Sequence, residues 1–352
     1  MNETPIEPKK HAEGILIAGI GSGSLGLELL KCISLVDEFL VYGADIDVSA
    51  AGHHDKRFEK TYSLQSTSAE SYCEELIQIC KRIDVAFVVP GAEITNRIIC
   101  KHQQSFRSNG ITPLVNSWGV FEICSNKVTC NNFLQYLKLP CVETIHVPIG
   151  SKLHNFDRLP CIVKPASQSG GSNLVFIAET LNEAKFFVEY LSSRGFDSCV
   201  QEYIDSDSEF TVGVLSSPEK EILSSIALKR NLTSKLSRSL AYGNRVVSSG
   251  WSQGRIEEFP EVCTQAERVA FALGSTWALN IQGRTRNGVF IPFEINPRHS
   301  GTSYFRALSG VNEILIGLNH LGGKRTPDAK GITPAVYSRV LVESVTYDHA
   351  VK

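Results

Sequence analysis

The chain has 352 residues, a length that suits two or three domains with separate hydrophobic cores. Its 35 Lys and Arg nearly balance 37 Asp and Glu, which argues against a nucleic-acid binder that relies on a basic excess. No apolar run reaches the ~18–20 residues that cross a bilayer, and the first residues lack the apolar core of a secretory signal. We therefore expect a cytoplasmic protein with no nucleic-acid or membrane partner.

The 10 cysteines are scattered and form no Cys-x-x-Cys pair. Several lie inside apolar runs, which is typical of buried free thiols and not of a disulfide framework. Free thiols are consistent with a reducing compartment.

The first part of the chain alternates expected strands with expected helices. Strands are predicted at Ile15–Ile20, in the run FLVYGADID and at Val85–Pro90. Thr67-Ser-Ala-Glu70 matches a capping box and predicts the start of a helix. This alternation predicts a parallel sheet with helices on both faces, ending near Trp118.

The second part has a different character. A helical stretch is predicted at about Phe121–Leu137, a second capping box at Thr180 and Glu183, and a helix from about Pro260 to Leu273. Several strands follow one another without intervening helices, in SCVQEYI, EFTVGVL, ILSSIAL and VFIPFEI. We expect an α+β region with much antiparallel pairing.

A Gly-rich turn follows the first strand. Gly21, Gly23 and Gly26 match G-x-G-x-x-G, and Asp45 and Asp47 follow about twenty residues later. Glycines let a backbone approach a pyrophosphate at a helix N-terminus, which indicates a dinucleotide site. The same residues also suit any tight strand-to-helix turn, so both interpretations stay open here.

Two lysines from separate elements indicate a phosphate site. Lys127 lies in a helical stretch, and Lys164 ends an apolar strand before a proline. Lysines act as point charges for phosphate oxygens. A Ser/Gly-rich loop after Lys164 offers backbone N–H groups that could fold over a triphosphate; its central residues are Ser169, Gly170, Gly171 and Ser172.

An acidic strand and turn come next, in VQEYIDSDSEF. The strand edge from Glu202 to Ile204 could pair with an adenine edge through backbone groups, and Glu209 could reach ribose hydroxyls. Taken alone, the same residues are also an ordinary acidic strand and turn.

The segment NIQGRTRNGVFIPFEINPR carries the sharpest signal. Glu294 and Asn296 are two apart on an expected strand, so both face the same side. Their oxygens suit Mg²⁺, and Arg298 follows where it could stabilise a transferring phosphoryl group. Gln282 and Arg284 lie on the preceding strand of an expected hairpin.

Together these motifs, in this order and ending in FEINPR, resemble an ATP-grasp enzyme. The resemblance covers about residues 13–320 and is closest to carboxylate–amine ligases and the carbamoyl phosphate synthetase large subunit. It implies a Rossmann-like preATP-grasp domain at 1–118, an ATP-grasp domain at 119–325 with lobes at about 119–200 and 201–325, and a C-terminal extension at 326–352.

The resemblance also implies residue roles by matched position. ATP would contact Lys127, Lys164, Ser169, Gly170, Gly171, Ser172, Glu202, Tyr203, Ile204 and Glu209. Mg²⁺, or Mn²⁺ in its place, would contact Glu294, Asn296 and Gln282. The catalytic residues would be Arg298, Lys229 and Arg230. Substrate would contact Gly21, Gly23, Glu93, Arg284, Gly301, Thr302 and Arg306.

The implied activity is an ATP-dependent ligase for small molecules. It would convert a carboxylate to an acyl-phosphate, join it to an amine and release ADP and phosphate, with a homodimer as the expected assembly. Two alternatives stay open. One is an ATP-grasp enzyme with another acceptor, either carbamoyl-phosphate-forming or carboxylating; the other is an NAD-dependent oxidoreductase that uses the GSGSLG turn.

Overall fold

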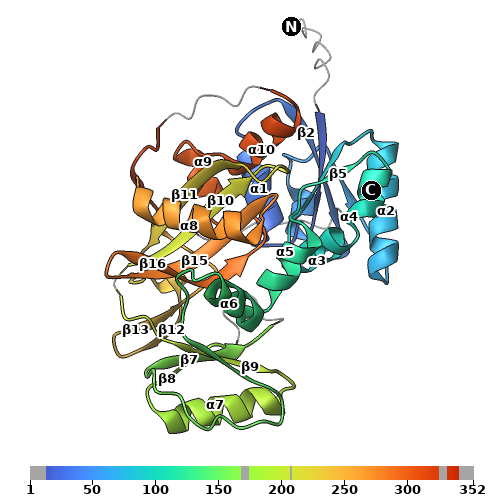
Figure 1. Ribbon diagram of the computed structural model, residues 1–352. Helices are drawn as coiled ribbons and strands as arrows, with labels where there is room; N and C mark the ends of the chain where they lie inside the picture. The colour runs from blue at the N-terminus through green and yellow to red at the C-terminus, as the bar shows by residue number, and fades with distance from the viewer. Residues whose placement is uncertain (1–12, 168–173, 207, 325–330, 341–352) are drawn as a thin grey trace, which may run out of the picture. The chain divides into compact units, whose positions relative to one another are not determined.

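The computed structural model describes residues 13–167, 174–206, 208–324 and 331–340 (Figure 1). Its contacts divide the chain into two compact units, residues 1–114 and 115–352. In the described part of the chain, no helix is both long and apolar enough to cross a membrane. All 10 cysteines are free thiols, and only Cys141 and Cys263 are not fully buried.

The first unit is a five-stranded parallel sheet in the order β3-β2-β1-β4-β5. Its strands are β1 (Glu13–Ala18), β2 (Phe39–Asp45), β3 (Lys60–Ser63), β4 (Phe87–Pro90) and β5 (Thr112–Pro113). Its helices are α1 (Leu25–Ile33), η1 (Ala51–His54), α2 (Ala69–Arg82), α3 (Glu93–Lys101) and α4 (Gln103–Ser108). The alternation of strands and helices seen in the sequence is confirmed.

The start of α2 differs from the predicted capping box by one residue. Ser68, not Thr67, is the N-cap: its hydroxyl accepts from the Ser71 N–H at 3.1 Å, and the Ser71 hydroxyl accepts from the Ser68 N–H at 3.0 Å. Ser68 and Ser71 have the same spacing as the predicted pair, so they form an equivalent box. Glu70 instead occupies the first turn, where a negative charge complements the helix dipole.

The Gly-rich turn is built around a close approach of backbones. A Cβ on Gly26 would lie 2.1 Å from the Gly19 carbonyl oxygen, and the Gly26 N–H donates to the Gly91 carbonyl at 2.9 Å. Gly23 has φ +65°, a value that favours glycine. Asp45 Oδ2 accepts from the Ile20 N–H at 2.7 Å. These residues therefore have packing roles within the turn itself.

The second unit begins with two helices where one was predicted. α5 (Trp118–Ser125) and α6 (Lys127–Tyr136) are separated by Asn126, whose backbone is extended. Asn126 caps α6, because its side-chain oxygen accepts from the N–H groups of Val128 and Thr129 at 2.9 and 3.0 Å. The single helix over Phe121–Leu137 is thus wrong, and the break places Lys127 in the first turn of α6.

A four-stranded antiparallel sheet in the order β6-β9-β7-β8 forms one lobe of this unit (Figure 1). Its strands are β6 (Thr144–Val147), β7 (Cys161–Pro165), β8 (Phe176–Ala178) and β9 (Ser198–Glu202). Helix α7 (Leu181–Ser193) packs on one face, through Ala184, Val188 and Leu191. Its N-terminus has the predicted capping box of Thr180 and Glu183.

A six-stranded antiparallel sheet in the order β16-β15-β10-β11-β14-β17 forms the rest of the unit. Its strands are β10 (Glu209–Ser216), β11 (Ile222–Arg230), β14 (Gly254–Ile256), β15 (Ala278–Arg286), β16 (Val289–Asn296) and β17 (Ala335–Tyr337). Between β11 and β14 lie η2 (Lys235–Ser237) and the hairpin of β12 (Arg238–Tyr242) and β13 (Arg245–Ser248).

Helices cover both faces of this sheet. Helix α8 (Pro260–Leu273), at its predicted bounds, packs on the face that carries Phe210 and Ala227. Ile226 and Leu228 alternate with Ala227 and so face the other side, where they pack with Phe305 of α9 (Ser303–Leu308). Helix α10 (Glu313–Leu321) follows α9.

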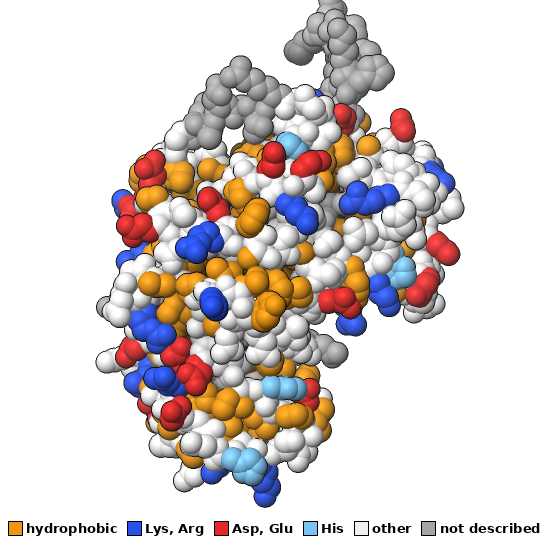
Figure 2. Space-filling view, viewed as in Figure 1, with side chains coloured by type: hydrophobic (Ala, Val, Ile, Leu, Met, Phe, Trp, Pro, Cys, Tyr) orange, Lys and Arg blue, Asp and Glu red, His pale blue; other side chains and the backbone are white. Residues whose placement is uncertain are grey.

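Charged side chains of both signs are interspersed over the face of the molecule shown in Figure 2. This distribution agrees with the formal net charge of −2. Other charged side chains are buried inside the second unit, among them Lys164, Glu209 and Arg230.

Gly26→Ala tests whether the Gly-rich turn is a packing feature. The new Cβ would clash with the Gly19 carbonyl, so we expect a loss of roughly 1–3 kcal/mol in the free energy of unfolding. Gly21→Ala is the control, because nothing lies within 4 Å of its Cβ position. Urea denaturation of both variants measures the difference. Equal stabilities would contradict the packing role.

Candidate nucleotide and metal site

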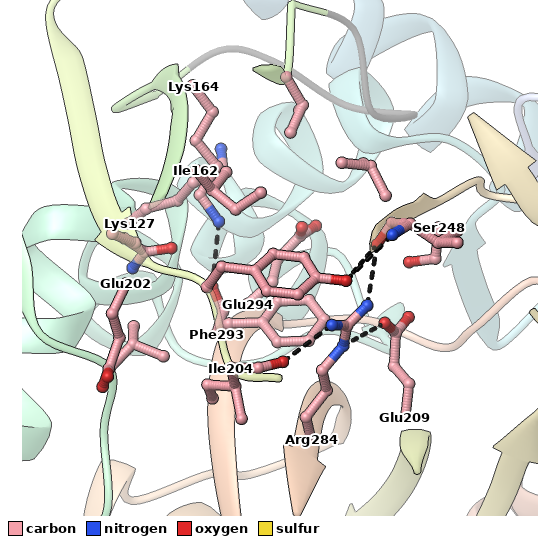
Figure 3. Close-up of a pocket in the computed structure, with 16 residues that line it drawn as sticks. Lys127, Ile162, Lys164, Glu202, Ile204, Glu209, Ser248, Arg284, Phe293 and Glu294 are labelled. Carbon is pink, nitrogen blue, oxygen red and sulfur yellow. Dashed lines mark hydrogen bonds and ion pairs between the residues drawn. The ribbon is translucent and has the colours of Figure 1, made fainter. Parts of the chain in front are cut away.

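A pocket lies in the second unit, between its four-stranded and six-stranded sheets (Figure 3). Both sheets, helix α6 and the β12–β13 hairpin contribute to its walls. It is lined by Lys127, Val142, Ile162, Lys164, Val175, Gln201, Glu202, Tyr203, Ile204, Glu209, Val246, Val247, Ser248, Arg284, Phe293 and Glu294.

One end of the pocket gathers two lysines and a carboxylate. Lys164 on β7 is buried, and its Nζ donates to the Phe293 carbonyl oxygen at 3.3 Å. Burial lowers the pKa of Lys164. Burial would raise the pKa of Glu294, but the charges of Lys127, Lys164 and Arg298 and the hydrogen bond from Asn296 together hold that pKa below its ordinary value. Glu294 is therefore ionised at neutral pH.

Asn296 and Arg298 extend this cluster along β16 and the loop that follows. Asn296 Nδ2 donates to Glu294 Oε1 at 3.1 Å, so the two side chains share a face as predicted. Arg298 Nη2 donates to Asn296 Oδ1 at 3.4 Å, and its Nη1 donates to the His299 carbonyl at 3.1 Å. Gln282 lies directly across from Glu294 in the β15–β16 register, on the same face.

The metal-ligand set fits Mg²⁺ better than a soft metal. Within the described ranges no group of three or more His, Cys, Asp or Glu side chains could hold a metal ion. Glu294 and Asn296 offer one ionised carboxylate and one amide oxygen. Mg²⁺ accepts this small set when phosphate oxygens and waters complete its octahedron.

Next to this cluster, two arginines share the carboxylate of Glu209. Arg284 Nε donates to Glu209 Oε2 at 2.9 Å, and Arg230 Nη1 forms an ion pair with Oε1 at 3.4 Å. The side chains of Glu209 and Arg230 are each 1% exposed. Glu209, predicted to reach ribose, thus lines the pocket with its carboxylate already bound to Arg284 (Figure 3).

The same Arg284 fixes the β12–β13 hairpin over the pocket. It donates to the carbonyl oxygens of Ile204 and Val246 at 2.9 and 2.8 Å, and it stacks on the Tyr203 ring at 4.5 Å. The Val246 N–H donates to the Tyr203 hydroxyl at 3.0 Å. Arg284, predicted to contact substrate, lines the pocket and also links strand β15, the hairpin and the pocket wall.

Glu202, at the end of β9, is held by its own partners. Arg286 donates to both carboxylate oxygens at 2.9 and 3.2 Å, and the Glu143 N–H donates at 3.1 Å. Burial opposes ionisation, but the hydrogen bonds of Arg286 and the Glu143 backbone outweigh it and lower the pKa of Glu202. The expected strand edge is wrong, because β9 lies between β6 and β7, and the N–H groups of Glu202 and Tyr203 donate to the carbonyls of Glu143 and Pro160, each at 3.0 Å.

Several predicted residues do not join this cluster. Lys229 pairs with Phe210 across β10 and β11, so its side chain points to the α8 face, opposite Arg230. Arg306 has no exposed surface, and it donates to Glu313, Thr211 and Asn280 inside the core. These positions do not offer the contacts with acyl-phosphate or substrate that were expected of them.

The remaining predicted residues lie elsewhere. Thr302 is buried, with its Oγ1 2.9 Å from the Ser300 hydroxyl, and Gly301 precedes it in the loop after β16. Gly21, Gly23 and Glu93 belong to the first unit, where Glu93 is exposed at the start of α3. The predicted loop of Ser169, Gly170, Gly171 and Ser172 lies outside the described residues.

The apolar walls of the pocket were missed by the sequence analysis. Val142, Ile162, Val175 and Phe293 come from four different segments, and Val246 comes from the hairpin. In the sequence they are ordinary strand and loop residues. Only Phe293 carried a signal, since it directly precedes Glu294.

Glu209→Gln tests the shared carboxylate. The isosteric amide leaves two buried arginines without their counter-charge, so we expect a loss of roughly 3–5 kcal/mol in the free energy of unfolding. Glu202→Gln is the control, because Arg286 is 46% exposed and such a pair contributes about 0–1 kcal/mol. Urea denaturation at neutral pH compares them. A Glu209→Gln loss no greater than that of Glu202→Gln would contradict the pairing.

His299, next to Arg298, gives the fold a pH dependence. Burial lowers its pKa from 6.5 to about 4, with the Glu313 charge opposing. Between these values the unfolded chain binds a proton that the folded chain does not, so stability falls as pH drops from 6.5 towards 4. One proton corresponds to about 1.4 kcal/mol per pH unit. Denaturation of wild type and His299→Gln across this range should show that the unfolding free energy of the variant changes less steeply with pH. Equal slopes would refute the role of His299 in this pH dependence.

Comparison with known proteins places this geometry in a known class. A family model described as ATP-grasp in the biosynthetic pathway with Ter operon matches residues 197–343. No curated protein sequence matches the chain significantly.

Solved structures similar to the chain share little sequence with it. Biotin carboxylase of Campylobacter jejuni, in complex with β,γ-ATP, has a TM-score of 0.63 at 16% identity, covering 91% of this chain and 73% of that one. N5-carboxyaminoimidazole ribonucleotide synthetase of Thermotoga maritima has a TM-score of 0.62 at 15% identity, and the match covers 92% of this chain and 79% of that one. L-amino acid ligase of Bacillus licheniformis has a TM-score of 0.63 at 15% identity, and the match covers 89% of this chain and 74% of that one. Fold and family match agree with the predicted resemblance: this chain is a protein of the ATP-grasp fold.

Proposed function

We propose that the chain is an ATP-dependent ligase that activates a carboxylate as an acyl-phosphate and joins it to an amine. The observation that carries this proposal is the half-buried carboxylate of Glu294 in one pocket with Lys127 and Lys164, beside the apolar walls. An N5-carboxyaminoimidazole ribonucleotide synthetase and an L-amino acid ligase are among the similar structures, which supports a ligase reaction.

The pocket would hold the nucleotide along its length. The apolar walls would receive the base, with backbone groups of Glu202, Tyr203 and Ile204 as hydrogen-bond partners. Lys127 and Lys164 would meet the phosphates. Burial lowers the pKa of Lys164, and a bound polyphosphate would oppose this shift by supplying counter-charge to the ammonium group.

Glu294 and Asn296 would hold Mg²⁺, with Gln282 as a third oxygen ligand on the adjacent strand. When bound, the ion would neutralise charge on the phosphate oxygens. Gln282 Oε1 lies 3.4 Å from Arg230 Nη1, so Arg230 would orient this amide. Mn²⁺ would satisfy the same oxygen ligands.

The reaction would proceed in two balanced steps. A carboxylate oxygen attacks the γ-phosphorus of ATP, the bond to the β–γ bridging oxygen breaks, and ADP leaves. The amine nitrogen then attacks the acyl carbon, phosphate leaves with the C–O bonding pair, and the nitrogen loses a proton. Arg298 and Arg230 would stabilise the negative charge on the phosphoryl oxygens.

Within the second unit, substrate positioning would involve the loop after β16, where Gly301 and Thr302 lie. We propose residues 1–118 as the substrate-shaping domain, residues 119–325 as the ATP-grasp domain and a homodimer as the assembly. A carboxylating reaction is the second candidate, because biotin carboxylase is also among the similar structures.

Glu294→Gln tests the proposed ligase. We expect ADP release with MgATP, a carboxylate and an amine to fall by about 100-fold or more, because the amide removes the charged metal ligand. The assay uses panels of carboxylates and amines and detects the condensed product by mass. Glu257→Gln, which removes only an exposed carboxylate paired with Arg255, is the matched control.

Two outcomes would count against the proposal. Glu294→Gln with full activity would remove the metal role of Glu294. ADP release from bicarbonate with no amine product, in the wild-type chain, would favour the carboxylating reaction instead.

A further inference from the structure

The C-terminal segment is built into the second unit. Strand β17 pairs with β14 at the edge of the six-stranded sheet, with Ala335 opposite Ile256 and Tyr337 opposite Gly254. The Tyr337 ring packs on Phe305 of α9, with ring centroids 5.3 Å apart. The segment therefore has a fixed register, and this register determines where the next residues lie.

Arg339, two residues after β17, reaches the loop that follows the candidate metal strand. Its guanidinium donates to the Gly301 carbonyl oxygen and lies over the rings of Phe305 and Trp251, at 4.7 and 5.8 Å from their centroids. Its backbone N–H donates to Gln253 Oε1 at 2.9 Å. Contacts with these rings reduce the freedom of the planar cation to move away from its acceptor.

Gln253 connects Arg339 to a second loop. Its Nε2 donates to the Ser234 hydroxyl at 2.9 Å, and its carbonyl accepts from the Asn231 N–H at 2.7 Å. Asn231 directly follows Arg230. The Nη2 of Arg230 donates to the carbonyl of Ser249, which lies with Gln253 in the connection between β13 and β14. The contacts of Arg339 thus reach the loops that follow both Arg230 and Asn296.

We propose that Arg339 is a positioning residue for the proposed ligase. It holds the loop of residues 297–302, which carries Arg298, in its position beyond Glu294 and Asn296. Arg339 lines no part of the nucleotide pocket among the residues described. Its loss should therefore impair turnover and leave nucleotide binding intact. This inference rests on the proposed function for its kinetic part only.

The test uses the full chain with Arg339→Ala, Arg339→Lys and the control Val336→Ala. Val336 lies on β17, three residues before Arg339, and is 64% exposed, so its truncation leaves the strand pairing and the contacts of Arg339 in place. Hydrogen exchange of peptides spanning residues 298–302 measures the loop directly. Turnover is measured as ADP release, and nucleotide affinity with a non-hydrolysable ATP analogue.

For Arg339→Ala we expect exchange in residues 298–302 to accelerate about 10-fold and turnover to fall about 10- to 100-fold, because small misplacements near the chemistry are costly. The affinity for the ATP analogue should change less than about 2-fold. Arg339→Lys should be intermediate, since its ammonium can donate to the Gly301 carbonyl but lacks the planar face. Val336→Ala should match wild type in all three measurements.

Two results would overturn the proposal. One is wild-type exchange in residues 298–302 of Arg339→Ala. The other is a parallel loss of exchange protection throughout the sheet together with weaker nucleotide binding, which would make Arg339 a general stability residue. If Arg339→Ala does not fold, Arg339→Lys decides by the same criteria. If the wild-type chain turns over no substrate, the proposed ligase fails, while the exchange comparison still decides the role of Arg339.

Discussion

A buried charge must find a partner, and this requirement organises one face of the six-stranded sheet. Glu209 accepts from Arg284 and pairs with Arg230, at positions where all three side chains are almost completely excluded from solvent. Removing one charge would leave another uncompensated in a medium that solvates ions poorly. The three strands that carry these residues, β10, β11 and β15, are therefore joined by buried ion pairs as well as by their backbone hydrogen bonds.

The same requirement explains why lysines and a carboxylate lie together at one end of the pocket, where the phosphates are proposed to bind. Lys164 is buried next to an ionised Glu294, and neither would be stable as an isolated charge in that place. A ligand that brings negative charge and a divalent cation would complete this arrangement instead of disturbing it. The apolar walls, including Ile162 and Phe293, exclude water and so strengthen each of these interactions.

The sequence predicted the features that depend on local pattern. The β15–β16 hairpin, helix Pro260–Leu273 and the shared face of Glu294 and Asn296 follow from alternation, capping and periodicity, and the structure has them. The sequence-based prediction failed where strand pairing determines which face of the sheet a side chain occupies. Lys229 and Arg230 are adjacent in sequence, but the pleat sends them to opposite faces, and only the pairing with β10 shows which face holds the pocket.

Long-range contacts were beyond reach for a similar reason. Nothing in the local sequence around Arg339 indicates that Gly301, 38 residues earlier, accepts its hydrogen bond. The position of the hairpin over the pocket could not be predicted from the local sequence either. Val246 makes its hydrogen bonds there through its backbone N–H and carbonyl, which every non-proline residue has. For Arg306 the error was different. Its charge suggested a contact with a ligand, but its guanidinium binds Asn280 and Glu313 inside the core.

The break between α5 and α6 has a mechanical consequence. Asn126 forms a bridge with Ser167, and the Lys127 N–H donates to the Ala166 carbonyl at 2.8 Å, just past the end of β7. Helix α6 packs through Cys130 and Leu134 on the core of the six-stranded sheet, while β7 belongs to the other lobe. This backbone junction therefore joins the two lobes next to both lysines. Lys127 and Lys164 belong to different lobes, but their spacing along the backbone is set by this contact.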